Sequence, residues 1–315
     1  MCADSENHPE ADEFDLIAWI REQVGRSPEV PIGPGDDCAG VHLPAGELML
    51  ITTDMVIDGV HFKSDEALPR KIGHKAIARA LSDIAAMGGT AGGIVVAVAT
   101  PRHLSMSWLQ EMVRGMIAAA DACDAQLVGG DVASGDLPLT VTVTCYGTGR
   151  KGRALRSSAH ATDMLLVTGE LGGSLLGRHL SFLPRIEEAR WLCDAVELHA
   201  MIDISDGLAA DANHLAEESG VAIELWEEAI PISDAAERMA KESGRTPLDH
   251  ALHDGEDYEL LFTVGAREAS ELVQRPDLPV RITCIGEVTD GGGLCIRKRG
   301  EERKPLDPKG WRHAL

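Results

Sequence analysis

The chain alternates between short apolar runs and longer stretches in which apolar residues recur every three or four positions. The first pattern is typical of buried strands and the second of amphipathic helices. The helical spacing predicts helices over residues 14–24, 72–87, 106–122, 174–179, 185–199, 205–219 and 233–242. The apolar runs predict strands over residues 48–53, 94–100, 125–128, 137–145, 164–168, 221–226, 258–264, 281–288 and 294–297. This mixture indicates an α/β or α+β fold.

A segment rich in Gly, Arg and Ser, residues 147–158, divides the chain into two comparable halves. Such segments commonly connect domains. We therefore expect a disordered tail over residues 1–12, an N-terminal domain over 13–149 and a C-terminal domain over 150–315. Gly147, Gly149 and Gly152 have the G-x-G-x-x-G spacing of dinucleotide-binding loops, but the residues after them predict no crossover helix. We interpret that match as coincidental.

The composition of the 315-residue chain limits its partners and its compartment. Hydrophobic residues make up 44% and aromatics only 3%, so Ala, Val, Ile and Leu must fill the cores of two domains. The net charge of −22 argues against nucleic acid and anionic membranes as partners. The 7 cysteines show no Cys-x-x-Cys spacing, so neither a disulfide framework nor a structural zinc site is expected. The odd number of cysteines fits a reducing cytosol, so we expect a cytoplasmic protein. No apolar run approaches the roughly 20 residues of a membrane span.

The familiar phosphate-binding motif with lysine is absent, because no Gly-Lys pair occurs in the chain. Aspartates beside small or apolar residues recur instead, in Asp36-Asp37, Thr52-Thr53-Asp54, Asp83, Gly129-Gly130-Asp131, Asp203, Ser205-Asp206 and Asp254-Gly255-Glu256-Asp257. Carboxylates that converge from several strand ends can share a site only if cations neutralise them. Oxygen donors suit Mg²⁺, which bridges carboxylates to substrate phosphates. The sequence therefore points to metal-assisted phosphate chemistry.

Each aspartate motif also has an ordinary structural interpretation. Asp37 follows Pro-Gly-Asp and fits a turn. Ser205 and Asp206 stand where a helix cap is expected. Asp83 has Arg79 four residues before it, as in an ion pair on a helix surface. Taken singly, each of these interpretations is at least as good as a functional one, and the order of the motifs along the chain favours function.

A series of longer motifs carries a resemblance to a known family. In order, the chain contains Gly35-Asp-Asp-Cys-Ala39, Thr52-Thr-Asp-Met-Val-Ile-Asp-Gly-Val-His-Phe62, Lys75-Ala-Ile-Ala-Arg-Ala-Leu-Ser-Asp-Ile-Ala-Ala-Met-Gly88, Gly129-Gly-Asp131, Ile202-Asp-Ile-Ser-Asp-Gly-Leu208 and Gly255-Glu-Asp-Tyr-Glu-Leu260. This series resembles the thiamine-monophosphate kinases over residues 14–311. Their superfamily includes aminoimidazole ribonucleotide synthetase, selenophosphate synthetase and a hydrogenase-maturation protein. The resemblance implies a two-domain fold, a homodimer that pairs through the N-terminal domains, and ATP in the cleft between domains.

The resemblance also implies roles for individual residues. Mg²⁺ ligands are expected from Asp37, Thr52, Thr53, Asp54, Asp83, Asp131, Asp203 and Asp206. ATP contacts are expected from Gly130, Asp131, Arg156 and Ser205. Thiamine monophosphate is expected to be held by His61, Glu256 and Trp311. Several Mg²⁺ ions and ATP are thus expected, and a role for a monovalent cation stays open.

The implied reaction is direct transfer of the ATP γ-phosphoryl group to thiamine monophosphate, giving thiamine diphosphate. A phosphate acceptor is already largely deprotonated near neutral pH, so we expect no nucleophilic side chain and no general base. Two alternatives are another ATP-dependent synthetase of the same superfamily and a non-catalytic nucleotide-sensing module. Cys2 has no neighbouring Lys, which disfavours selenophosphate chemistry, and the retained carboxylates disfavour a sensing module.

Overall fold

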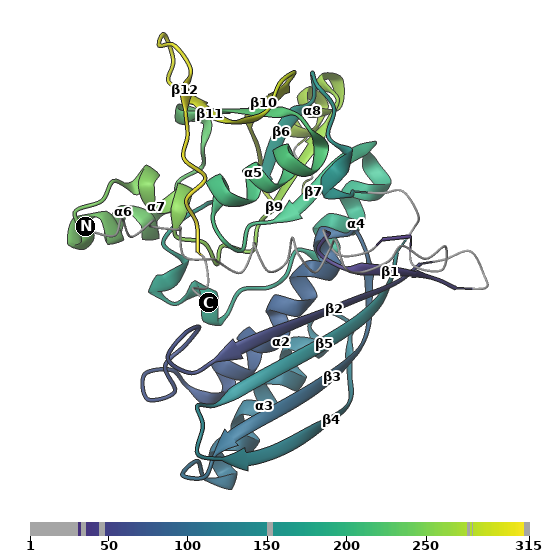
Figure 1. Cartoon of the computed structure of the whole chain (residues 1–315), viewed down its shortest axis with the longest axis vertical. Coiled ribbons are helices and arrows are strands. Elements are labelled where there is room, and N and C mark those ends of the chain that lie inside the picture. The colour runs from purple at the N-terminus through teal and green to yellow at the C-terminus, as the bar shows by residue number, and fades with distance from the viewer. Residues whose placement is uncertain are drawn as a thin grey trace, which may run out of the picture.

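The computed structural model describes residues 31–32, 36–43, 48–149, 154–275, 278 and 280–311. Its strands form two mixed sheets, one in each half of the chain, and Figure 1 shows helices packed against both. The tail expected over 1–12 and the helix expected over 14–24 lie outside the described residues. Among the helices that are described, none combines the length and the apolar character needed to cross a membrane.

In the N-terminal half, the described strands form a five-stranded sheet in the order β1-β2-β5-β3-β4. These strands are β1 (Ala39–His42), β2 (Leu48–Ile57), β3 (Thr90–Pro101), β4 (Gln126–Gly135) and β5 (Thr140–Gly149). Helices α2 (Pro69–Ala86) and α3 (Met106–Asp121) cover one face of the sheet, and no helix of the described chain covers the other (Figure 1). This uncovered face is therefore a candidate surface for contact with a second copy of the chain.

In the C-terminal half, the described strands form a seven-stranded sheet in the order β12-β11-β8-β10-β6-β9-β7. These strands are β6 (Met164–Thr168), β7 (Leu198–Asp203), β8 (Ala222–Trp226), β9 (Leu260–Val264), β10 (Ile282–Thr289), β11 (Gly293–Arg297) and β12 (Lys304–Pro305). The helices are α4 (Ile186–Ala195), α5 (Leu208–Ser219), α6 (Asp234–Ser243), α7 (Pro247–His253) and α8 (Ala266–Val273). Short 3₁₀ turns are η1 (Arg156–Ser158), η2 (Ser174–Leu176), η3 (Arg178–Leu180) and η4 (Glu227–Ala229).

Helix α2 lies between the two halves and contacts both. Its apolar stripe is buried against the first sheet, as the helical spacing predicts. It approaches α3 so closely that a Cβ on Gly73 would lie 2.0 Å from the carbonyl oxygen of Met112. The same core cluster continues through Ile84 of α2 to Leu192 of α4 and Leu260 of β9. The polar side of α2 faces the second half, to which its side chains are hydrogen-bonded.

Most expected elements are present, and the differences have local causes. The helix expected over 174–179 is wrong, because Gly172, Gly173 and Gly177 adopt positive φ values and break the segment into η2 and η3. The helix expected over 185–199 ends at Ala195, and β7 begins at Leu198. Elements β1, α7, α8 and β12 were not expected. The strand expected over 125–128 continues to residue 135 as β4, so the Gly-Gly-Asp motif lies inside a strand rather than at its end.

Candidate functional site

Three of the expected carboxylates meet where the two halves join. One ligand oxygen from each of Asp37, Asp83 and Asp203 lies within 4.8 Å of the others. Asp37 precedes β1, Asp83 is in the last turn of α2, and Asp203 ends β7. Asp37 and Asp203 are buried, and Asp83 is half-buried. The sequence expectation that aspartates converge from separate elements is therefore met for these three.

Burial and mutual repulsion make this cluster difficult to ionise. The pKa of Asp203 is raised to about 8, first by burial and then by the charge of Asp37. The pKa of Asp83 is also raised, first by burial and then by Asp54 and Asp203. Thr52 donates its hydroxyl to Asp83, and the Ser82 hydroxyl donates to Asp203 at 2.5 Å. Two neutral donors and the single positive charge of Arg156 do not balance three carboxylates, so the cluster fits a divalent cation.

Arg156 ties the cluster to the start of the second half. Its guanidinium donates two hydrogen bonds to Asp37, with Nε at 3.0 Å and Nη2 at 2.6 Å. Its backbone N–H donates to Asp36 at 2.8 Å. Asp37 is therefore more than a turn residue, because it joins residues that are 119 positions apart. Of the expected ATP contacts, Arg156 is thus beside the carboxylates.

A cavity of about 500 Å³ adjoins the cluster through Asp54. It is lined by both halves and contains seven expected site residues, namely Thr53, Asp54, His61, Ser205, Asp206, Glu256 and Trp311. Its other lining residues are Met55, Val60, Arg79, Leu175, Asp254 and Tyr258. The cavity lies beside the carboxylate cluster and is large enough for a small phosphate-bearing molecule.

Glu256 belongs to a charged network that sequence reasoning missed. The Lys75 side chain is fully buried, and its ammonium donates to Glu256 at 2.5 Å and to the His61 carbonyl at 2.6 Å. His179 Nδ1 lies 2.7 Å from the same carboxylate. Burial lowers the pKa of Lys75 to about 8, whereas hydrogen bonds from His179 and Lys75 help lower the pKa of Glu256 to about 2 despite burial. Lys75 is inside one of the family motifs, and its place on the polar side of α2 was the available signal.

Arg79 is a second residue whose place sequence reasoning missed. The alternative interpretation of Asp83 as the ion-pair partner of Arg79 is wrong, because Arg79 Nη2 lies 3.4 Å from Asp54 on β2 instead. Among the described residues, its buried Nε and Nη1 atoms have no hydrogen-bond partner. The buried hydroxyl of neighbouring Tyr258 is likewise unpaired within the described chain. Both residues line the cavity, so they offer it unfilled donors.

Ser205 and Asp206 lie in the loop before α5 and face the cavity. The helix starts at Leu208, and neither side chain caps it, so the capping interpretation is wrong. Asp211 takes that place, since its carboxylate accepts hydrogen bonds from the backbone N–H of Asp206 at 3.1 Å and of Gly207 at 3.0 Å. Trp311 is held beside this loop by its backbone N–H, which donates to the Asp206 carbonyl at 3.1 Å.

Gly130 and Asp131 are not brought to the other site residues within one chain. Register links Asp54 to Val143, Val143 to Val96 and Val96 to Gly130, so about 14 Å separates Asp54 from Gly130 at the usual strand spacing. Asp131 points to the opposite face of the sheet, because successive side chains alternate. Gly130 has a structural reason of its own, since a Cβ there would lie 2.1 Å from the Val96 carbonyl oxygen.

Comparison with known proteins extends over nearly the whole chain. Residues 35–149 match the AIR synthase related protein N-terminal domain, and residues 147–298 match the C-terminal domain of the same name. A thiamine-monophosphate kinase of Rhodopirellula baltica is 39% identical over 96% of this chain and 97% of its own length. One from Bacillus subtilis is 35% identical over 96% of this chain and 99% of its own.

A solved structure gives the same result in three dimensions. AaThiL complexed with AMPPCP and TMP superposes with a TM-score of 0.84 and 31% identity, covering 99% of this chain and 100% of that one. The resemblance inferred from the motifs and the two-domain fold that it implied are therefore confirmed. The chain belongs to the thiamine-monophosphate kinase family.

Proposed function

We propose that the protein transfers the γ-phosphoryl group of ATP to thiamine monophosphate and releases ADP and thiamine diphosphate. The observation that carries the proposal is the buried cluster of Asp37, Asp83 and Asp203 beside a cavity with unfilled cationic donors. Family membership supports it, and the AaThiL structure named above was solved with an ATP analogue and TMP. Such a pair of ligands is the combination that this reaction needs.

Mg²⁺ ions fit the donor set, since all candidate ligands are carboxylate or hydroxyl oxygens. We assign this role to Asp37, Thr52, Asp54, Asp83, Asp203 and Asp206, which line or adjoin the same site. Thr53 also lines the cavity, but its hydroxyl lies 3.2 Å from that of Thr144 on the other face of the sheet, so its assignment rests on the family resemblance. Bound Mg²⁺ would supply positive charge to the phosphate oxygens. The raised pKa values of Asp83 and Asp203 indicate carboxylates whose negative charge is uncompensated by the chain itself.

The side chains around the cavity hold the two substrates in line. Arg79 presents two unpaired N–H groups, which suit phosphate oxygens and leave its contact with Asp54 intact. Trp311, 48% exposed at the cavity wall, offers an aromatic face to the thiazolium cation of thiamine monophosphate. Glu256, kept ionised by Lys75 and His179, adds negative charge near that cation. The acceptor phosphate needs no activation by a side chain.

We further propose a homodimer that pairs through the uncovered face of the N-terminal sheet. Met55, Val95 and Tyr146 are exposed on that face at 46%, 43% and 43%. Asp131 lies on the same face, opposite to the phosphate site of its own chain. In a dimer built through this face, Gly130 and Asp131 of one copy reach the site of the other. A dimer thus explains both the exposed apolar side chains on this face and the distance of Gly130 and Asp131 from the phosphate site of their own chain.

Substrate turnover tests the proposed function. Purified protein with ATP and Mg²⁺ should convert thiamine monophosphate to the diphosphate and should not phosphorylate thiamine, measured by chromatography of the products. Asp54→Asn should reduce turnover by about 100-fold or more, as expected for a residue that neutralises and positions phosphate ligands. Asp136→Asn is the matched control, because the side chain of Asp136 is 97% exposed on a turn. Equal turnover of thiamine and thiamine monophosphate, or ADP release independent of either, would sink the assignment.

A further inference from the structure

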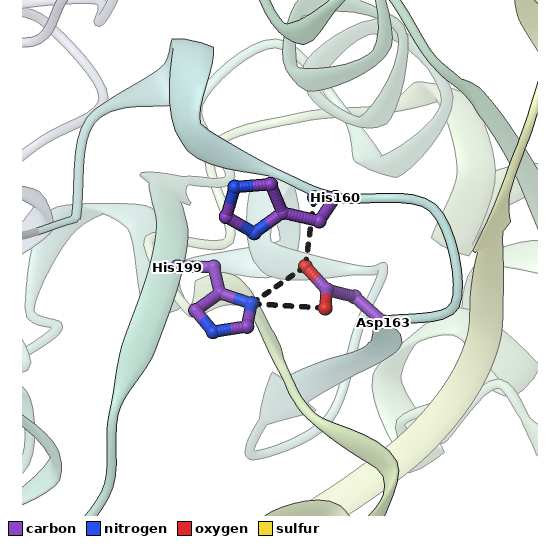
Figure 2. Close-up of side chains that lie close together, drawn as sticks. All are labelled: His160, Asp163 and His199. Carbon is purple, nitrogen blue, oxygen red and sulfur yellow. Dashed lines mark hydrogen bonds and ion pairs between the residues drawn. The ribbon is translucent and has the colours of Figure 1, made fainter.

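A second cluster of metal-binding side chains lies outside the phosphate site. One ligand atom from each of His160, Asp163 and His199 lies within 4.8 Å of the others. Figure 2 shows the two imidazole rings and the carboxylate facing one another. Nδ1 of His199 is 2.9 Å from both carboxylate oxygens, and the ring centroids of the two histidines are 4.7 Å apart. Two separate segments, the turn before β6 and strand β7, thus present donor atoms to one point.

The local backbone is shaped to bring these residues together. His160 and Asp163 begin and end a tight turn closed by the bond from the Asp163 N–H to the His160 carbonyl. At its third position Thr162 adopts a φ of 81°, which is rare for a β-branched residue. In β7 the register with β9 shifts between Leu198 and Met201, and such a bulge redirects the side chain of His199.

The kinds of donor in the cluster distinguish it from the phosphate site. Two imidazole nitrogens and one carboxylate suit Zn²⁺ and neighbouring transition metals, whereas Mg²⁺ prefers oxygen donors alone. The Asp163 side chain is buried, and that of His160 is exposed, so the cluster combines a fixed anionic ligand with access from solvent. We propose that His160, Asp163 and His199 bind a divalent transition-metal ion that fastens the turn before β6 to the start of β7.

This proposed metal site is separate from the phosphate site. His199 and Asp203 are at opposite ends of β7, about 13 Å apart at the usual rise per residue. From the sequence we considered zinc sites built from cysteines only. The three ligands here come from positions with no recognisable spacing, so this site was not predicted. Without a metal, His160 would only pack its ring edge-on against His199 and donate its backbone N–H to Asp163 at 2.9 Å. Loss of the His160 imidazole therefore distinguishes a metal site from a simple polar pair of His199 and Asp163.

Binding of Co²⁺ to the full-length protein tests the proposal. Protein that has been freed of transition metals and is kept in millimolar Mg²⁺ should bind one equivalent of Co²⁺. The bound ion should show the strong visible absorption of low-coordinate Co²⁺ with imidazole ligands. His160→Ala and His199→Ala should each weaken this equivalent at least about tenfold. His103→Ala, on an exposed turn, and Asp54→Asn, in the phosphate site, should both retain it.

A second measurement uses Zn²⁺ and thermal unfolding. Zn²⁺ should raise the melting temperature of the unmodified protein and of His103→Ala, because a ligand that binds the folded state stabilises it. His160→Ala should fold, since the replaced side chain is exposed, and should lose most of the shift. A Co²⁺ spectrum or a Zn²⁺ shift that His160→Ala leaves unchanged would overturn the proposal. So would a thiolate-to-cobalt charge-transfer band, which would assign the ion to a cysteine.

Discussion

A single residue shows its role most clearly where its polar atoms are buried and yet have no hydrogen-bond partner. Arg79 is such a residue, because two of its guanidinium nitrogens are buried without partners in the described chain while the third faces Asp54. A buried polar group without a partner is destabilising unless something binds it. In the proposed reaction, phosphate oxygens fill that position.

Replacement of Arg79 measures this contribution. Arg79→Ala should lower kcat/KM for thiamine monophosphate by about 10- to 100-fold, since a hydrogen bond to a charged group contributes about 1.5–3 kcal/mol. Arg79→Lys should recover only part of the loss, because lysine keeps the charge but not the planar fork. Arg102→Ala is the matched control, with its side chain 70% exposed on a turn. Steady-state kinetics of the three variants would contradict the assignment if Arg79→Ala matched Arg102→Ala.

The aspartates and Arg156 could be predicted from the sequence, whereas the places of Lys75 and Arg79 could not. Asp37, Asp83 and Asp203 could be recognised because small and apolar neighbours mark each motif. Arg79 was paired with Asp83 by helical spacing, a rule that considers one helix and cannot include Asp54 from a strand. Lys75 was missed for the same reason, since its partner Glu256 comes from the other half of the chain.

Among the elements, α2 and β7 determine the electrostatics of the site. Lys75, Arg79 and Asp83 follow each other at four-residue intervals on one side of α2. Asp203 at the end of β7 meets this side through the Ser82 hydroxyl. The helix therefore carries apolar residues toward its own sheet and charged residues toward the other half. Its amphipathicity was predictable, and the function of its polar side was not.

The raised pKa of Asp203 predicts how stability changes with pH in the absence of metal. The folded state keeps the Asp203 proton up to about pH 8, whereas the unfolded chain releases it near 3.8. The folded state is therefore favoured at low pH, and stability falls as pH rises from about 4 to 8. Within this window the free energy of unfolding falls by up to about 1.4 kcal/mol per pH unit.

Melting temperatures in a chelating buffer check this dependence. Asp203→Asn should make the curve of melting temperature against pH flatter than that of the unmodified protein, because the group that titrates is gone. Mg²⁺ should flatten it as well, since the bound cation compensates the ionised carboxylate. Parallel curves for Asp203→Asn and the unmodified protein would show that Asp203 does not cause the slope.

Expected elements were correct where one pattern of apolar residues ran through the whole element without interruption. The helices α2 and α3 and the strand β6 were predicted with bounds close to those observed. Prediction failed where tertiary contacts or glycine conformations decide, as in η2 and η3. Strand β4 was too short in the prediction, because Gly129, Gly130 and Asp131 interrupt its apolar pattern, yet pairing with β3 extends through all three.

At the scale of the whole molecule, the uncovered face of the N-terminal sheet leads to a prediction about assembly. Val95→Lys, on the uncovered face of the N-terminal sheet, should convert a homodimer to a monomer in light scattering at micromolar concentration. It should also reduce turnover, since Gly130 and Asp131 would no longer reach a phosphate site. Val273→Lys on α8 is the matched control, because Val95 and Val273 are both 43% exposed. A monomeric unmodified protein, or a dimer unaffected by Val95→Lys, would refute the proposed interface.

The carboxylate cluster takes Asp37 and Asp83 from one half and Asp203 from the other, so neither half can form the site alone. A chimaera that exchanges the halves of two relatives would have to match charge, backbone position and the Arg156 to Asp37 contact at once. Gene fusion or recombination at the connecting segment would break this agreement even when each half still folded. The two halves are therefore expected to be inherited together, as a single evolutionary unit.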